Sequence, residues 1–399
     1  MTEGDLKKKI KAEAKNIADW VIEIRRDIHA HPELGLQETR TSGLVAEHMR
    51  GLGLEVKTDI ATTGVTGLLR GGKPGRTLAI RADMDALPIK EMTGLPFASR
   101  NDGVMHACGH DAHVAMALGA ARILSGMRDS IHGNVKFIIQ PAEENFGGAS
   151  DMIEEGVLED PKVDAIIALH VEAPARLGAL VIKEGPIMAS ADAFMVSING
   201  KGGHSSEPQG CNDPIHIAAH TITALQTMIP RTLDARDPVV VSVCSIQAGT
   251  ALNIIPDSAH FGGTVRTLSN KRRAEMPEKM EDIIRGITST FGATYDFSYI
   301  EGVSVTLNDP AITRMMQDIA RELWGTDGVI EKENPLMGSE DYSLFLQKVP
   351  GAMGFLGASK GAGADYPAHH PKFDIDERCL QYGVELHCAA AIKFLNGEI

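Results

Sequence analysis

Apolar residues recur every three or four positions near the start of the chain, and this spacing predicts helices over residues 5–28 and 39–51. Short apolar runs follow and predict strands, at residues 54–58, 66–70, 77–81, 133–140 and 163–169. A stretch rich in alanine and leucine at 114–127 has the period of an amphipathic helix. Uninterrupted apolar strands that alternate with helices are typical of an α/β sheet with both faces covered.

Polar side chains stand where the last three of these strands end. Asp83 and Asp85 follow the strand at 77–81. Glu143 and Glu144 follow the next strand, and His170 follows the one after it. Ligands of α/β proteins bind beyond the carboxyl ends of the strands. The sequence therefore predicts that these side chains line one site.

The rhythm of the chain changes after Gly185 and Pro186. Six elements follow, at residues 192–199 (strand), 213–228 (helix), 238–246 and 260–267 (strands), 271–291 (helix) and 294–299 (strand). This βαββαβ order is that of a ferredoxin-like domain. A helix at 309–323 then restores the α/β pattern. We therefore expect a main domain formed by residues 1–187 and 303–399, interrupted by an inserted domain at 188–302.

Charge and composition exclude several classes of partner. The formal net charge is −14, so neither nucleic acid nor an anionic membrane surface is an expected partner. No apolar run reaches the roughly 18 residues of a membrane-spanning helix, and the lysine-rich start lacks the apolar segment of a secretory signal. The five cysteines are odd in number and scattered, which favours a reducing cytoplasm over a disulfide framework.

Residues 106–113 concentrate possible metal ligands directly before a predicted helix, whose dipole favours thiolate over thiol. Thiolate, imidazole and carboxylate together suit zinc, manganese, cobalt or nickel better than magnesium or calcium. Taken alone, a buried cysteine is usually a small apolar side chain, and a lone histidine is usually a hydrogen-bonded polar group. Several such residues at loops and strand ends favour a metal site, formed by Cys108, His110, Glu144, His170 and either His369 or His370.

Glu143 and Glu144 form a pair of carboxylates after a buried strand. Two adjacent glutamates are usually part of a solvated turn. When they are held at a strand end, however, neighbouring side chains point apart, so that one can bind a metal while the other takes a proton from water. A bound metal lowers the pKa of water from about 15.7 toward about 7, which makes hydroxide available at neutral pH.

Three residues of the inserted domain have side chains suited to substrate binding. His204, in the glycine-rich stretch 201–206, is either an exposed loop residue or an imidazole that stabilises an oxyanion. Asn253 can hydrogen-bond a substrate carbonyl, and Arg266 can pair with a carboxylate. A structural role fits these two residues equally well. Outside this domain, Ser339 is expected to cap the helix that follows it.

Several motifs occur in the order typical of one enzyme family. They are His-Ala-Cys-Gly-His-Asp-Ala-His at 106–113, Gln-Pro-Ala-Glu-Glu at 140–144, Gly-Gly-His at 202–204, Met-Gly-Ser-Glu-Asp-Tyr at 337–342 and His-His-Pro at 369–371, together with the stretch 26–35. Nearly end to end, the chain resembles the metal-dependent amidohydrolase/carboxypeptidase family. This family includes hippurate hydrolases, N-acyl-L-amino-acid amidohydrolases and plant auxin-conjugate hydrolases.

The resemblance implies a two-metal exopeptidase-like catalytic domain with the inserted ferredoxin-like domain as its lid. Two divalent metal ions per subunit are expected, with manganese, zinc, cobalt and nickel as the possible identities. The ligands that the resemblance implies are Cys108, His110, Glu144, His170 and His369, with His370 as the alternative to His369.

The resemblance also assigns roles to residues beside the metals. Glu143 falls on the general base, and His204 on the lid histidine that contacts the substrate or the tetrahedral intermediate. Related two-metal exopeptidases have a histidine in the strand-end motif that reads Asp83-Met84-Asp85 here. Cys108 then stands in for that histidine, and Asp85 is expected to orient a ligand.

The expected activity is hydrolysis of the amide bond of N-acyl amino acids, such as hippurate-like or N-acetyl conjugates. Alternatives on the same site are a dipeptidase or carboxypeptidase acting on short peptides, and an aminohydrolase acting on a non-peptide substrate. A binding protein with structural metals is a different class, but the intact Glu143–Glu144 pair and the lack of a closed tetrahedral Cys/His set oppose it. The resemblance also admits a homodimer or homotetramer formed through the lid domain, with His204 acting within its own subunit or across the interface.

Overall fold

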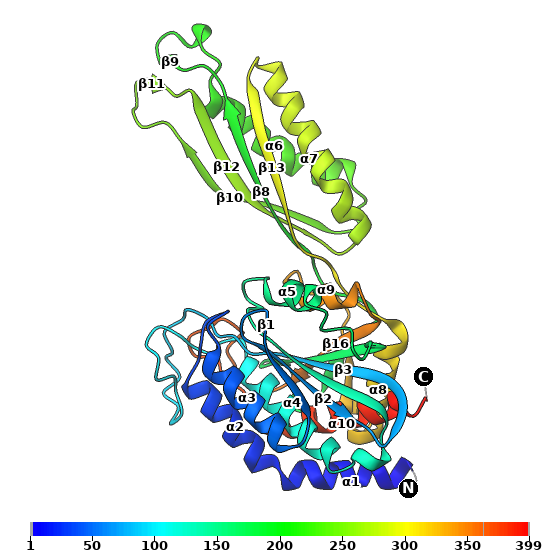
Figure 1. The fold of residues 1–399 in the computed structure, drawn as a ribbon. Helices are drawn as coiled ribbons and strands as arrows, with labels where there is room; N and C mark the ends of the chain where they lie inside the picture. The colour runs from blue at the N-terminus through cyan, green and yellow to red at the C-terminus, as the bar shows by residue number, and fades with distance from the viewer. Residues whose placement is uncertain (1–2, 362, 398–399) are drawn as a thin grey trace. The chain divides into compact units, whose positions relative to one another are not determined.

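The structure, a computed structural model, describes residues 3–361 and 363–397. The chain divides into two compact units. The first unit consists of Met1–Ile187, Leu307–Asn334 and Leu344–Ile399, and the second of Met188–Thr306 and Pro335–Ser343. Figure 1 shows that both ends of the chain belong to the first unit. The chain passes from the first unit to the second within β7 (Gly185–Met188) and returns within β14 (Thr306–Asn308).

This division differs from the expected domain boundaries at two places. Residues 303–306 stay with the second unit, because the last strand of that unit runs on to Val303. Residues 335–343 also belong to the second unit, although they lie far along the chain from it. The backbone N–H of Ala189 donates to the carbonyl of Leu336 (3.0 Å), which ties this segment to the start of the unit. Such a long-range backbone contact leaves no local signal in the sequence.

The first unit is built on an eight-stranded mixed sheet in the order β1-β2-β4-β3-β5-β16-β6-β15. Its strands are β1 (Glu55–Ile60), β2 (Gly64–Arg70), β3 (Lys73–Asp83), β4 (His132–Gln140), β5 (Ala165–Glu172), β6 (Leu180–Ile182), β15 (Val329–Glu331) and β16 (Gly351–Gly357). The three strands β4, β3 and β5 are neighbours and run parallel. Their carboxyl ends therefore meet at one edge of the sheet, as the sequence predicts.

Helices cover this sheet in Figure 1. The helices of this part of the chain are α1 (Glu3–Asn16), which packs on other helices, α2 (Ala18–Ala30), α3 (Thr39–Gly51), α4 (His110–Ser125), α5 (Gly148–Glu154), α8 (Pro310–Trp324), α9 (Tyr342–Leu346), which begins in the second unit, and α10 (Cys379–Leu395). The single helix expected over residues 5–28 is interrupted at Ile17, where the backbone leaves helical geometry (φ −100°, ψ 3°). Within the described residues, no helix is long and apolar enough to cross a membrane.

Helix α4 is not the amphipathic helix that its sequence period predicts. All of its residues except Arg122 and Ser125 are buried. The helix packs against β3 and β5 and against α2 and α10, so it has almost no solvent-facing side. A helix that is apolar all round belongs to the interior of a protein, and α4 therefore holds its first turn rigidly at the sheet edge.

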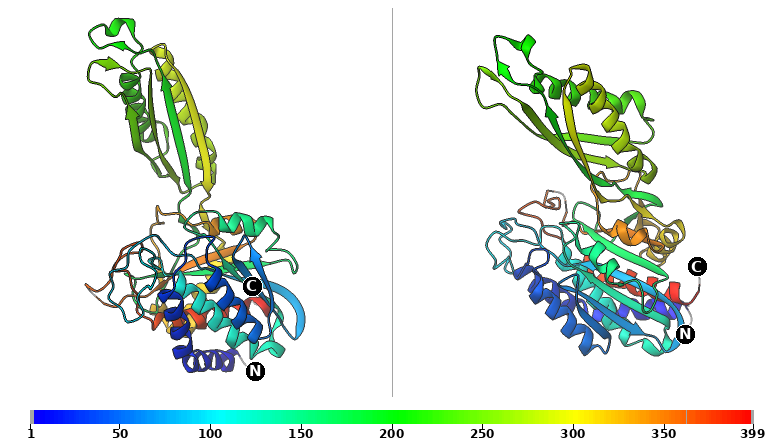
Figure 2. Two further views of the ribbon diagram at one scale, coloured as in Figure 1. Left: turned by 60° about the vertical axis from the view of Figure 1, so that its left-hand side comes forward. Right: turned by 45° about the horizontal axis from the view of Figure 1, so that its top comes forward.

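The second unit confirms the predicted βαββαβ order. Its elements are β8 (Ala191–Asn199), β9 (Gly203–His204), α6 (Pro214–Thr232), β10 (Val239–Ala248), β11 (Ile254–Ile255), β12 (Ser258–Thr267), α7 (Asn270–Thr290) and β13 (Thr294–Val303). The four long strands form an antiparallel sheet in the order β10-β12-β8-β13, and β9 pairs with β11 in a separate two-stranded ladder. Figure 2 shows α6 and α7 lying along the four-stranded sheet.

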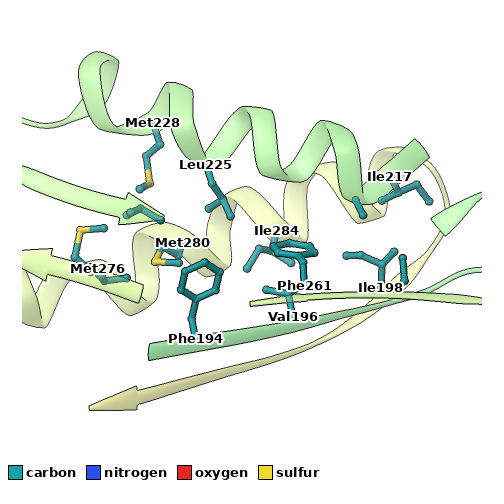
Figure 3. Close-up of a cluster of buried hydrophobic side chains, with 14 of the residues drawn as sticks. Phe194, Val196, Ile198, Ile217, Leu225, Met228, Phe261, Met276, Met280 and Ile284 are labelled. Carbon is teal, nitrogen blue, oxygen red and sulfur yellow. The ribbon is translucent and has the colours of Figure 1, made fainter. Parts of the chain in front are cut away.

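The core of the second unit lies between its helices and its sheet (Figure 3). Phe194, Val196 and Ile198 alternate along β8 and point to the same side, as the two-residue period of a strand requires. Side chains of α6 and α7, among them Leu225 and Met280, close over them.

A buried group of charges joins three parts of the first unit. Arg25 of α2 is 1% exposed, and its guanidinium donates to Asp111 Oδ2 (3.1 Å), Asp374 Oδ1 (3.0 Å) and Glu377 Oε1 (3.1 Å). Asp111 lies in the first turn of α4, and the other two carboxylates lie in the loop before α10. His29, one turn beyond Arg25, places its Nδ1 2.8 Å from Asp111 Oδ2. Buried charges persist only when they are paired in this way.

The pairing changes the protonation of His29. Burial, the largest single influence, lowers the pKa of this imidazole, but the carboxylates of Asp111 and Glu91 together outweigh burial and raise the pKa to about 9. A second carboxylate, that of Glu91, lies 3.3 Å from Nε2 of the same ring. His29 is therefore a cation at neutral pH and links two carboxylates.

Stability should decrease at alkaline pH because of this pair. The pKa of His29 in the folded protein lies above the value of about 6.5 of an unfolded chain. The stabilisation is therefore fully present below about pH 6.5 and is lost as the pH rises through about 9. Urea unfolding of the metal-free protein between pH 6 and pH 10 measures it. The variant His29→Asn keeps an N–H donor for Asp111 but cannot take up a proton, so it should lose this part of the pH dependence; an unchanged slope in that variant would assign it to other groups.

Candidate metal centre

The sheet edge gathers the side chains that the sequence predicts as metal ligands. Among the described residues, several groups of possible ligands have their ligand atoms within 4.8 Å of one another, and three of these groups contain the predicted ligands: Cys108, His110 and His170; Cys108, Glu144 and His369; and His110, Glu143 and Glu144. The groups share members, so they form one continuous cluster of sulfur, nitrogen and oxygen donors. All of these residues belong to the first unit.

Cys108 and His110 reach the cluster because of the glycine between them. Gly109 has φ of 92°, in the left-handed region that favours glycine. A Cβ at this position would lie 2.3 Å from Cγ2 of Val171, a residue of β5. Only glycine therefore allows the chain to turn into α4 this close to the strand, with Cys108 before the turn and His110 as the first residue of the helix.

Asp85 orients the imidazole of His110. Its Nδ1 lies 2.9 Å from the backbone carbonyl of Asp85 and 3.1 Å from Oδ1 of the same residue. A proton on Nδ1 satisfies these acceptors and leaves the lone pair of Nε2 free. That Nε2 is buried and has no hydrogen-bond partner among the described residues. Oδ2 of Asp83 lies 3.7 Å from this nitrogen, and one ligand atom of His110 lies within 4.8 Å of those of Cys108 and His170, so the surrounding donors fit a metal ion.

Asp85 also holds the turn that carries the paired glutamates. The backbone N–H of Glu144 donates to Asp85 Oδ2 (3.1 Å). One carboxylate thus fixes a helix residue and a turn residue at the same time. The turn is further held by the buried Glu38, which accepts a hydrogen bond from the backbone N–H of Ala142 (2.9 Å). Glu143, between these anchors, is 6% exposed.

His170 lies inside β5, not after its end as predicted, because the strand continues to Glu172. Its Nδ1 donates to the carbonyl of Val171 (2.8 Å), and its Nε2 lies 3.3 Å from Cys108 Sγ. Burial lowers the pKa of His170 to about 3, so the imidazole is neutral, as a metal ligand must be.

His113, for which the sequence identifies no partner, supports His170. Its Nδ1 lies 2.5 Å from Oδ1 of Asp83, and its Nε2 accepts a hydrogen bond from the backbone N–H of Val171 (2.9 Å). Asp83 is in turn held by Arg81, whose Nη1 donates to Oδ2 (2.6 Å). A series of hydrogen bonds therefore runs from β3 through α4 to β5 and ends at the residue next to His170. The signal in the sequence was Asp83 at the strand end, but nothing in the sequence pairs it with His113.

Burial reverses the expected protonation of Cys108. The helix dipole predicts a thiolate, but removal of the thiol from water raises its pKa to about 12, and the opposing influence of His110 is smaller. The thiol is thus protonated unless a cation is bound beside it. Zinc, manganese and similar ions meet this requirement, because a coordinated thiol loses its proton. The donor set and the orphan nitrogen of His110 together fit such a metal.

His369, rather than His370, takes part in the cluster. Its backbone N–H donates to the carbonyl of Ala107 (2.7 Å), which fixes the loop beside Cys108, and its φ of 67° is left-handed. Nε2 lies 3.1 Å from Glu144 Oε1, and this hydrogen bond raises the pKa of the imidazole. The ring of His370 instead stacks on Tyr366, with ring centres 4.5 Å apart.

The three residues expected to bind substrate all belong to the second unit. His204 pairs with Ile254 in the β9–β11 ladder, and its exposed ring is held at Nδ1 by the hydroxyl of Ser206 (2.7 Å). The backbone carbonyl of Asn253 accepts a hydrogen bond from the backbone N–H of Ser205 (3.2 Å). Asn253 therefore lies next to the residue that follows His204.

Arg266 and Ser339 contact each other in the second unit. Arg266 Nη1 donates to Ser339 Oγ (2.8 Å). The expectation that Ser339 caps a helix is wrong, because α9 begins later, at Tyr342, where the side chain of Glu340 accepts from the first backbone N–H (3.2 Å). The hydroxyl of Ser339 instead accepts the hydrogen bond from Arg266.

Comparison with known proteins shows which family has this architecture. The model of peptidase family M20/M25/M40 matches residues 79–393. Thermostable carboxypeptidase 2 of Saccharolobus solfataricus is 44% identical over 98% of this chain and 100% of its own length. The N-acetylcysteine deacetylase of Bacillus subtilis is 40% identical over 92% of this chain and 95% of its own length.

Among solved structures, the chain is similar to the Bacillus subtilis YXEP protein, described as a dinuclear metal binding peptidase of the M20 family. The identity is 36%, the TM-score is 0.85, and the match covers 96% of this chain and 99% of that one. The agreement extends over both units and confirms the fold class and the family that the motifs resemble. The chain belongs to peptidase family M20/M25/M40, a family of hydrolases.

Proposed function

We propose that the protein is a metal-dependent amidohydrolase that cleaves the amide bond of N-acyl amino acids. The observation that carries this proposal is the buried carboxylate of Glu143, held within 4.8 Å of the ligand atoms of His110 and Glu144. A structural metal site has no need of an additional buried carboxylate at this position, whereas hydrolysis requires a base beside the metal. The turn geometry supplies one.

Two divalent metal ions are proposed, held by Cys108, His110, Glu144, His170 and His369. The overlapping ligand groups support this number, as does the dinuclear description of the similar YXEP protein. When bound, such ions act as Lewis acids that polarise an amide carbonyl and acidify water. Sulfur, nitrogen and oxygen donors together favour manganese, zinc, cobalt or nickel.

Glu143 is proposed to accept the proton of the attacking water and to deliver it to the leaving amine. Its burial keeps bulk water away from this proton during the transfer. His204 is proposed to donate a hydrogen bond to the oxyanion, with its ring held at Nδ1 by Ser206. Arg266 and Asn253 are proposed to bind the carboxylate and the carbonyl of the substrate.

The activities for which two similar proteins are named support this substrate class. A deacetylase of N-acetylcysteine and a carboxypeptidase both cleave an amide whose nitrogen belongs to an amino acid with a free carboxylate. A carboxypeptidase acting on short peptides is therefore the second candidate. The two functions differ in the substrate group on the acyl side of the scissile amide. A short peptide has a charged amine there, and an N-acyl amino acid does not. Turnover of N-acetylglycine but not of the dipeptide glycylglycine would decide for the first.

Replacement of the proposed base should abolish turnover without loss of metal. The variant Glu143→Gln keeps the size and hydrogen-bonding reach of the side chain but cannot accept a proton. We expect kcat on an N-acyl amino acid to fall about 10³-fold, with the metal content unchanged by elemental analysis. Near-normal turnover in this variant would show that another group is the base.

The hydrogen bond from Val171 to His113 should control metal affinity through His170. In His113→Asn the side chain retains a donor for Asp83 but loses the acceptor for Val171. In His113→Gln an acceptor remains near the position of Nε2. We expect the first variant to bind Mn²⁺ or Zn²⁺ about 10- to 100-fold more weakly and the second to lose less, as measured by titration calorimetry of the metal-free proteins.

The thermal stability of the two metal-free variants serves as the control for this comparison. Equal stability with unequal metal affinity assigns His113 to the support of the ligand. Equal metal affinity in both variants and the wild type would contradict the assignment.

A further inference from the structure

Two histidines lie one helical turn apart on α6 of the second unit. His216 and His220 are both exposed. Residues at positions i and i+4 lie on the same face of a helix, and this is the spacing at which a helix presents two imidazoles to one metal ion. The pair takes no part in the candidate metal centre, whose residues all belong to the first unit.

Helix α6 fixes the backbone that carries the two imidazoles. Its opposite side is anchored in the core of the unit, where Ile217 is buried (Figure 3). Its first turn is capped by Asp213, whose Oδ1 accepts from the backbone N–H of His216 (3.4 Å). The Cα positions of His216 and His220 are therefore set by the fold, and only their side-chain torsions are left to decide where the rings lie.

The two imidazole rings of His216 and His220 are separated by the distance that a shared metal ion requires. Their centres are 4.5 Å apart. A nitrogen that binds an ion at about 2.0–2.1 Å places its ring centre roughly 3.2 Å from that ion, so two rings at right angles around the ion are about 4.5 Å apart and two at the tetrahedral angle about 5.2 Å. Rotation about the bond to the ring selects the nitrogen that faces the ion and hardly moves the ring centre. The separation matches the right angle, which is typical of tetragonal Cu²⁺ and Ni²⁺ sites.

Phe291, which follows α7, contacts both rings of the pair. The ring of His220 stacks on it, with centres 5.6 Å apart and an interplanar angle of 28°. The ring of His216 meets it edge to face, with centres 5.3 Å apart and an angle of 86°. These contacts restrict the side-chain torsions of both histidines before any ion binds. Less conformational entropy is then lost on binding than for two freely rotating imidazoles.

The nitrogens of the pair are also available to a ligand. The other two histidines of the second unit are hydrogen-bonded to serine hydroxyls, at 2.7 Å for His204 and 2.9 Å for His260. Among residues 3–361 and 363–397, no side chain or backbone group bonds to the imidazole of His216 or His220. Within α6 the charged side chain nearest to them in the sequence is that of Arg231, which lies in the last turn of the helix.

We propose that His216 and His220 form a metal site of the second unit, which binds one Cu²⁺ or Ni²⁺ ion through both imidazoles. The site is separate from the candidate metal centre and does not rest on the proposed function. Magnesium and calcium are excluded as its ligands because they prefer oxygen donors. A bound ion joins two residues one turn apart, so it stabilises the first half of α6 in the folded protein.

The site is tested by calorimetric titration of the metal-loaded protein with Ni²⁺, for the wild type and for His216→Gln and His220→Gln. Glutamine is at least as good a helix former as histidine, so both variants should fold, and circular dichroism checks this. We expect the wild type to bind one more Ni²⁺ per chain than either variant. Ni²⁺ should also slow hydrogen exchange of the α6 amides in the wild type alone. Any Ni²⁺ that enters the first unit does so in all three proteins and cancels in the comparison.

A matched control removes a single exposed histidine from the same unit. In His260→Gln the imidazole lost is one that bonds to serine hydroxyls, so this variant should bind as much Ni²⁺ as the wild type. Equal binding of Ni²⁺ by the wild type and both α6 variants would refute the site. Loss of the ion in only one α6 variant would refute binding through both imidazoles, and an equal loss in the control would identify the binding as a general property of surface histidines.

Discussion

Two buried carboxylates at the end of β3 are the constraint on which the site depends. Asp83 and Asp85 are separated by one residue, and each holds an imidazole of α4: Asp83 holds His113 and Asp85 holds His110. Their burial would be unfavourable without partners. Arg81 pairs with Asp83, and the backbone of Glu144 donates to Asp85. The strand, the helix and the turn that carries Glu143 and Glu144 are therefore positioned by the same two side chains, which also fix the positions of the candidate ligand atoms.

Much of this arrangement follows from patterns visible in the sequence. The uninterrupted apolar runs of β3, β4 and β5 predict buried parallel strands, and parallel strands bring their carboxyl ends together. The prediction that Glu143, Glu144 and His170 meet near Cys108 and His110 rests on this rule and on the helix predicted at 114–127, directly after residues 106–113; the helix itself begins earlier, at His110. In the second unit, the strand and helix periods alone predict the ferredoxin-like order, because the six elements of that order are long and core-facing side chains alternate along β8.

Other features depend on contacts that no local pattern records. The partner of His113 is a strand residue thirty positions earlier in the chain, and Ser339 is bonded to an arginine from another element rather than to its own helix. The protonation of Cys108 shows the same limit. The helix dipole is a local property that predicts a thiolate, whereas desolvation depends on everything packed around the sulfur, and it is the larger effect.

Backbone strain links the stability of the fold to the chemistry of the site. Ala142 and His369 take left-handed conformations next to Glu143 and Cys108, and each is held there by a hydrogen bond to a distant element: Glu38 for the first, Ala107 for the second. A relaxed turn would cost less free energy, but it would let Glu143 and His369, the proposed base and one proposed ligand, move relative to the other proposed ligands. Buried α4 and the hydrogen-bonded charges around Arg25 lie in the interior of the same unit, and that interior holds in place the strained turn at which the reaction is proposed to take place.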